Sequence, residues 1–347
     1  MLYIRQTACI SPQETIFHTN MNTIHAAVDG KLKAIEPVYE NIPPNILRRM
    51  GKAVRMGIGA ALQILKNGEL ANGIIIGTAN GGIDDCTKFL QQIIEYDEGI
   101  LAPGNFVQSV PNAIAAQLGL LTKNQGYNIT HVHNGLSFEN ALIDAAMQLI
   151  EHPDHNYIVG GVEEISSSYY NIEVLKGDFT TASVSTKDFY LPESKTSVAG
   201  EGAAMFLAGS NKKNSIAKII GIDTIHTNET EKVKQKLENF LKQYSSSGKI
   251  DLLISGENGN NRLLKFYSTV ESIIGNNMPV VRFKHLCGEY ASASSYATWL
   301  ACQLFLHQNV PSHLLKKESS PDNINKIIIY NNFAGVQHSF VLIENLD

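Results

Sequence analysis

The chain has 347 residues, of which 44% are hydrophobic and 18% are charged, a composition typical of a globular protein large enough for two core-forming units. Its formal net charge of −5 at pH 7 argues against a nucleic-acid binder, which normally needs a basic surface, so we expect no nucleic-acid partner. The cysteines lie far apart and form no CxxC pair, which argues against a disulfide framework and a thiolate metal site. We therefore expect no metal and no cofactor.

Short apolar runs alternate with segments of helical periodicity along the chain, and this alternation predicts an α/β protein. After an N-terminal strand, the predicted strands are 73–76, 128–132, 157–159, 203–207, 216–222, 252–254, 280–282, 326–330 and 339–343. The predicted helices are 47–66, 84–95, 112–119, 139–151, 229–244, 261–274 and 292–307.

A polar, lysine-bearing segment, GSNKKNS at 209–215, separates two halves that each contain strands and helices. We therefore predict two units, residues 1–209 and residues 216–347. The start, MLYIRQTACISP, does not have the pattern of a signal peptide, and no apolar run is long enough to span a bilayer. We expect a cytoplasmic protein with no membrane partner.

The segment Tyr127–Ile150 has the layout of a nucleophile elbow. A β-rich run leads to a sharp turn at Gly135 and then to a helix whose apolar residues recur at spacings of three and four. A residue at such a turn lies at the N-terminus of a helix, where the helix dipole stabilises a thiolate. Glycine at this turn has no side chain that could act as a nucleophile.

Further motifs accompany the elbow in a fixed order. They are GTANGG (77–82), VPNAIAAQLGL (110–120), GGVEE (160–164), GEGA (200–203), ISGENGN (254–260), KHLCGE (284–289) and YNNFAGVQHS (330–339). The ordered set resembles the β-ketoacyl-acyl-carrier-protein synthases, which are condensing enzymes of the thiolase fold. The resemblance implies an α/β fold of two similar halves in αβαβα layers. It also implies acyl carrier protein and acyl thioesters as partners, and a homodimer or a heterodimer with an active β-ketoacyl synthase.

The chain departs from this family at the chemical positions. The family elbow, S-T-A-C-A-S-G-T, aligns without gaps on Val132–Glu139 and places the catalytic cysteine at Gly135. The two family histidines fall on Glu257 and Glu289, whereas the family lysine is kept as Lys284. Ionised glutamates would repel a developing enolate, so we expect a buried Glu257–Lys284–Glu289 ion network in place of a catalytic one. We also expect Gly135 to hold a strained turn without steric cost.

Two interpretations of the function follow, and whether the protein is an enzyme stays open between them. The first is a non-elongating partner subunit that resembles a chain-length factor, in fatty acid, polyketide, or aryl-polyene or flexirubin-type pigment biosynthesis. The second is an active acyltransferase or 3-oxoacyl synthase with a rearranged site, in which Ser137 with His133, or Glu257 with Glu289, carries the reaction. Cys287 is a further candidate nucleophile. The competing structural roles are a helix N-cap for Ser137, a core histidine for His133 and a buried, inert thiol for Cys287.

Overall fold

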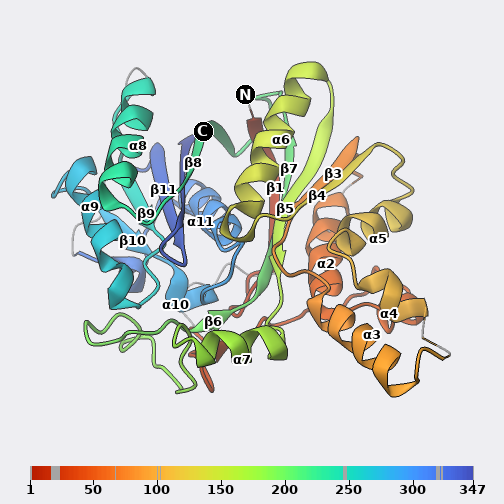
Figure 1. Cartoon of the computed structure of the whole chain (residues 1–347). Helices are drawn as coiled ribbons and strands as arrows, with labels where there is room; N and C mark the ends of the chain where they lie inside the picture. The colour runs from red at the N-terminus through yellow and green to blue at the C-terminus, as the bar shows by residue number, and fades with distance from the viewer. Residues whose placement is uncertain are drawn as a thin grey trace.

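The computed structural model describes residues 2–16, 24–66, 68–99, 101, 103–244, 248–317, 321 and 323–346 (Figure 1). These residues form a ten-stranded mixed sheet with helices on both faces and a small two-stranded sheet. The strands lie side by side in the order β10 (Val280–Arg282), β9 (Leu252–Ser255), β11 (Lys326–Phe333), β12 (Gln337–Asn345), β8 (Ala217–His226), β1 (Leu2–Ile10), β7 (Gly202–Gly209), β5 (Asn156–Glu163), β3 (Gly73–Gly77) and β4 (Tyr127–His131). The small sheet pairs β2 (Lys31–Leu32) with β6 (Ala199–Gly200).

The large sheet consists of two five-stranded halves with the same topology. In the first half β1, β7 and β5 are antiparallel neighbours, and β5, β3 and β4 are parallel neighbours. In the second half β8, β12 and β11 are antiparallel, and β11, β9 and β10 are parallel. The halves meet where β1 pairs with β8. Equivalent turns of the two halves therefore follow β4 and β10, and both contribute to the candidate site.

The helices are α1 (Pro44–Leu47), α2 (Lys52–Leu65), α3 (Ile83–Glu95), α4 (Pro103–Gln108), α5 (Ala113–Thr122), α6 (Ser137–Glu151), α7 (Ser167–Leu175), α8 (Thr230–Gln243), α9 (Leu264–Ile274), α10 (Lys284–Cys287) and α11 (Ser294–His307). Short 3₁₀ turns add Asn134–Leu136, Asn261–Leu263 and Ser312–Leu314. None of the helices in the described part of the chain is long and apolar enough to cross a membrane.

Three apolar cores hold the helix layers against the two halves of the sheet. The central core contains residues of α6 and α11 packed between the two halves of the sheet. A second core joins α2 and α5 to the outer face of the first half, and a third joins α8 and α9 to the outer face of the second half (Figure 1). Helix α11 is buried on all sides from Ser294 to Phe305, as expected for a helix in the middle layer. The αβαβα arrangement and the α/β class predicted from the sequence are confirmed.

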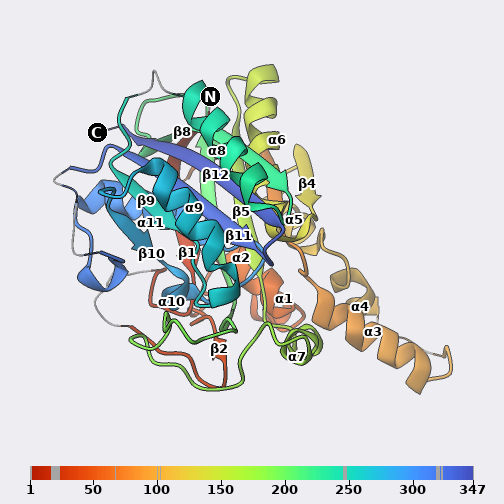
Figure 2. The same cartoon turned by 60° about the vertical axis from the view of Figure 1, so that its left-hand side comes forward.

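The predicted elements are present, with one interrupted helix and several elements that were not predicted. The helix predicted over 47–66 is interrupted, because Gly51 is the N-cap of α2 and residues 48–50 connect α1 to it. Helices α4, α7 and α10 and the short strands β2 and β6 were not predicted. Helices α3 and α4 extend away from the body of the molecule (Figure 2). The division into units 1–209 and 216–347 stays a prediction, and the sheet continues across this boundary.

Candidate functional site

The elbow connects β4 to α6, and its left-handed residue is Asn134. Asn134 has a φ of 46°, a conformation that asparagine tolerates better than most residues, whereas Gly135 has no positive φ. The expectation that Gly135 provides the strained backbone is therefore wrong. The absence of a side chain at Gly135 matters for a different reason, which is the close approach of a neighbour.

That neighbour is Phe333, the last residue of β11. A Cβ atom built on Gly135 would overlap the Cβ of Phe333 and would lie 2.6 Å from its Cγ. In proteins, Cβ atoms essentially never lie within 3.0 Å of non-bonded heavy atoms of this kind. Phe333 therefore occupies the space that a nucleophilic side chain at position 135 would need.

The backbone amide of Gly135 is also engaged. It donates a 2.8 Å hydrogen bond to Oε1 of Gln337, the first residue of β12, which is buried. The Gln337 side-chain amide in turn donates to the His133 carbonyl over 3.3 Å. An oxyanion hole needs a free N–H aimed at the developing charge, and here Gln337 already accepts from the elbow amide.

The proposed Ser137–His133 dyad is contradicted by the geometry. The Ser137 hydroxyl is fully buried, donates to the Asn134 carbonyl and accepts from the His133 backbone N–H, both over 2.8 Å. The ring of His133 is instead 2.9 Å from the side-chain amide of Asn140. Ser137 is the first residue of α6 and closes the elbow through its hydroxyl, so its role is structural, but the expected N-cap role is wrong because the N-cap of α6 is Leu136.

The turn after β10 carries a buried ion pair. Lys284 Nζ lies 2.6 Å from Glu289 Oε1, and the lysine side chain is completely buried. The other Glu289 oxygen accepts from Nδ2 of Asn258 over 2.6 Å. Glu289 is fixed by its backbone as well, because its N–H donates to Val198 and its carbonyl accepts from Gly200.

Glu257 does not belong to this pair, so the predicted three-membered network is wrong in this part. Its carboxylate pairs with Arg282 Nη1 at 3.1 Å and with Lys316 Nζ at 2.6 Å. The neighbouring Asn258 faces Glu289 instead. Glu257 and Glu289 consequently have no shared proton or substrate position, which leaves no acid–base pair of the kind considered above.

Cys287 does not take the place of a missing nucleophile. Its thiol is buried and donates to the Gly288 carbonyl over 3.3 Å. Burial raises the pKa of this thiol well above its ordinary value, so it stays protonated. Among the residues that the structure describes, no group of three or more histidine, cysteine, aspartate or glutamate side chains is arranged to hold a metal ion.

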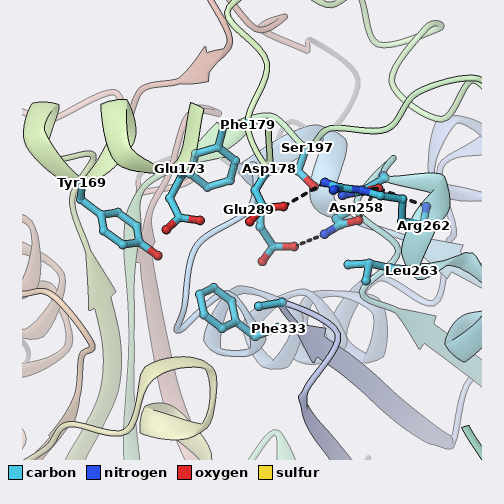
Figure 3. Close-up of a pocket in the computed structure, with 12 residues that line it drawn as sticks. Tyr169, Glu173, Asp178, Phe179, Ser197, Asn258, Arg262, Leu263, Glu289 and Phe333 are labelled. Atoms are coloured by element: carbon cyan, nitrogen blue, oxygen red, sulfur yellow. Dashed lines mark hydrogen bonds and ion pairs between the residues drawn. The ribbon is translucent and has the colours of Figure 1, made fainter. Parts of the chain in front are cut away.

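Beside these residues lies a pocket of about 210 Å³. Figure 3 shows Tyr169 and Glu173 of α7 on one side, Glu289 and Asn258 behind, Arg262 on the opposite side and Phe333 below. Phe333 lines this pocket and contacts the elbow, whereas Gly135 does not line it. Tyr169 and Glu173 were not predicted as site residues, because α7 was not predicted.

The repeated sheet topology, the two central helices and the strand–turn–helix elbow together define a thiolase-like condensing-enzyme scaffold. The family model for the N-terminal domain of β-ketoacyl synthases matches residues 25–232, which is more than half of the chain. The protein therefore belongs to the β-ketoacyl synthase family, as the sequence motifs indicated.

Solved structures support the same fold over almost the whole chain. A β-ketoacyl synthase from Burkholderia phymatum STM815 aligns with a TM-score of 0.79 at 12% identity, covering 99% of both chains. The ketosynthase ApeO in complex with its chain length factor ApeC, from Xenorhabdus doucetiae, gives 0.80 at 14% identity, and the ishigamide ketosynthase/chain length factor gives 0.77 at 13%. Each of these two alignments covers 99% of this chain and 98% of the other. A search of curated proteins found no match.

Proposed function

We propose that this protein is a non-elongating subunit of the chain-length-factor type, which pairs with an active β-ketoacyl synthase and forms no acyl-enzyme itself. The observation that carries the proposal is the contact of Phe333 and Gln337 with Gly135. One fills the nucleophile's space and the other engages the elbow amide. The buried Lys284–Glu289 pair supports the same conclusion, because an anion replaces a hydrogen-bond donor at the position expected for a catalytic histidine.

The alternative of an active acyltransferase with a rearranged site lacks support in the geometry. No histidine ring contacts the Ser137 hydroxyl, Glu257 pairs with two cations, and the Cys287 thiol is buried. We therefore propose no second function.

Strand β4 is the surface we propose for the partner synthase. It is one of the two terminal strands of the sheet among the described residues, the other being β10, and an unpaired edge is an attractive site for another chain. Two exposed apolar residues lie beside it. Val132 directly follows β4, and Val110 lies two positions before Asn112, whose Oδ1 accepts from Thr130 of β4. Val132 is 53% exposed and Val110 is 47% exposed. Acyl carrier protein, which appears in a solved complex of a similar fold with its ketosynthase, is the further partner we propose.

The partner proposal is tested by co-expression with a cysteine-bearing β-ketoacyl synthase from the same source, followed by size-exclusion chromatography with light scattering. We expect a 1:1 heterodimer. Val132→Asp should weaken it by about tenfold or more, because a charge would be buried at the interface core. Val38→Asp is the matched control, since Val38 is 81% exposed and lies outside this surface. A chain that stays monomeric or pairs only with itself would contradict the proposal.

A further inference from the structure

The inner end of the pocket is formed by carboxylate oxygens. The Glu173 side chain is 11% exposed and that of Glu289 is 6% exposed, and both point into the pocket (Figure 3). Their counter-ions, Lys176 and Lys284, are not among the residues that line it. A ligand that enters therefore meets the anionic side of each ion pair first.

Tyr169 completes this inner end with a neutral hydrogen-bond donor. Its hydroxyl has no hydrogen-bond partner in the described part of the chain. Burial raises the pKa of this phenol well above its ordinary value, and the negative charges of Glu173, Glu163 and Glu289 raise it further. The group therefore stays protonated and can donate to a carbonyl oxygen of a ligand.

The outer end holds Arg262, the one cationic side chain that lines the pocket within the described residues, and its Nε and Nη2 are engaged. Arg262 Nη2 pairs with Asp178 at 2.9 Å and also donates to the Gly177 carbonyl over 2.8 Å. Its Nε donates to Oδ1 of Asn260 over 3.2 Å. A carboxylate that reached the inner end would find no free cation there, and an unpaired buried carboxylate is costly.

We infer that this pocket accepts a neutral acyl thioester and rejects an acyl group that ends in a carboxylate, such as malonyl. The inference rests on the proposed function and deepens it. A synthase must accommodate the malonyl carboxylate before it can release CO2. In this pocket, the carboxylate oxygens of Glu173 and Glu289 would face the malonyl carboxylate and repel it. Glu173 and Glu289 would therefore select neutral acyl groups over carboxylate-terminated ones, and this selection does not depend on the missing nucleophile.

A matched pair of ligands tests the inference on the full-length wild-type chain. S-malonyl-pantetheine and S-malonamyl-pantetheine have nearly the same size, and the second carries a carboxamide in place of the carboxylate. Isothermal titration calorimetry should show that the amide binds about tenfold or more tightly than the acid. Equal or tighter binding of the malonyl compound would overturn the inference, and so would the absence of binding by both compounds.

Variants then test whether Glu173 causes the preference for the amide over the acid. Glu173→Gln should raise the affinity for the malonyl compound about threefold or more and leave the amide nearly unchanged. Glu229→Gln is the control, because Glu229 forms a surface ion pair of the same i,i+3 kind with Lys232. An unchanged ratio in Glu173→Gln would overturn the assignment. These measurements involve no chemical reaction and no partner subunit. The binding preference can therefore be absent while the proposed function holds, and the proposed function can fail while the binding preference is present.

Discussion

At Gly135, two neighbours from the β11–β12 hairpin take the space and the backbone amide that a nucleophile would use. Phe333 ends one strand of the hairpin and Gln337 begins the other, so a single connection of three residues between them fixes both contacts. Because the two contacts come from one hairpin, restoring a thiol alone would not restore a condensing site.

Gly135→Cys tests this arrangement at the scale of a residue. The new Cβ collides with Phe333, so we expect a loss of roughly 1–3 kcal/mol in the free energy of unfolding, measured by urea denaturation. Phe333→Gly added to this variant should recover part of the loss, because it removes the colliding atoms.

Gly104→Cys is the matched control for the thiol itself. No heavy atom lies within 4 Å of the Cβ position at Gly104, so this variant should unfold close to the wild type. If Gly135→Cys is as stable as Gly104→Cys, the account of the elbow is wrong.

Part of the site could be predicted from the sequence, and the limits are physical. The Lys284–Glu289 pair followed from one motif, since the two residues flank a single tight turn. The orientation of the SGENG segment did not follow, because adjacent residues point in different directions and only packing decides that Asn258, rather than Glu257, faces Glu289. Gln337 was missed for a similar reason: its contact with Gly135 spans 202 positions in the chain.

Helix α2 depends at its N-terminus on the buried carboxyl of Glu164. Its Oε2 accepts from the Ala53 N–H over 3.0 Å, while Oε1 is buried without a hydrogen-bond partner. The pKa of Glu164 is raised from its ordinary value of 4.5 to about 7, chiefly by burial. The hydrogen bond from the Ala53 N–H lowers this pKa, whereas the negative charges of Asp84 and Asp85 raise it. The folded state therefore binds this proton more tightly than the unfolded state does.

The sign of the resulting pH dependence follows from that shift. The stabilising contribution is present below about pH 4.5 and is lost as the pH rises through about 7. Glu164→Gln is neutral at every pH and has a similar shape. Relative to the wild type, it should gain about 1–3 kcal/mol in the free energy of unfolding between about pH 5 and about pH 8.

Urea unfolding at these two pH values provides the measurement. Glu238→Gln, on the exposed side of α8, is the control and should show no such gain. A difference between Glu164→Gln and the wild type that does not change with pH would refute a raised pKa.

Elements with a clear apolar period could be predicted from the sequence, and α7 shows why others could not. Its sequence, SSYYNIEVL, is rich in aromatic and β-branched residues, which favour strands. Tertiary packing determines the helix, with Tyr170 buried and Glu173 nearly so. One local signal was available, since Ser166 precedes the helix and accepts a hydrogen bond from the Tyr169 N–H as its N-cap.

At the scale of the whole molecule, the duplicated sheet explains how distant segments form one site. The elbow after β4 and the Lys284 turn after β10 are equivalent connections in the two halves, and each leads toward a helix of the central core. The sequence motifs indicated the fold through their order along the chain. The internal repeat could not be read from the sequence, because the equivalent turns, HVHNG and FKHLC, share no pattern.

The central claim is that this scaffold carries no acyl-enzyme chemistry, and intact-mass spectrometry tests it most directly. The purified chain would be incubated with carrier protein that is loaded with an acyl chain and, separately, with carrier protein that is loaded with malonyl. A cysteine-bearing synthase treated in the same way would be the positive control. We predict an unchanged mass and no release of CO2 from this chain, while the control gains the acyl group. A stable acyl adduct, or CO2 released by the chain alone, would contradict the account, and peptide mapping would then identify the nucleophile.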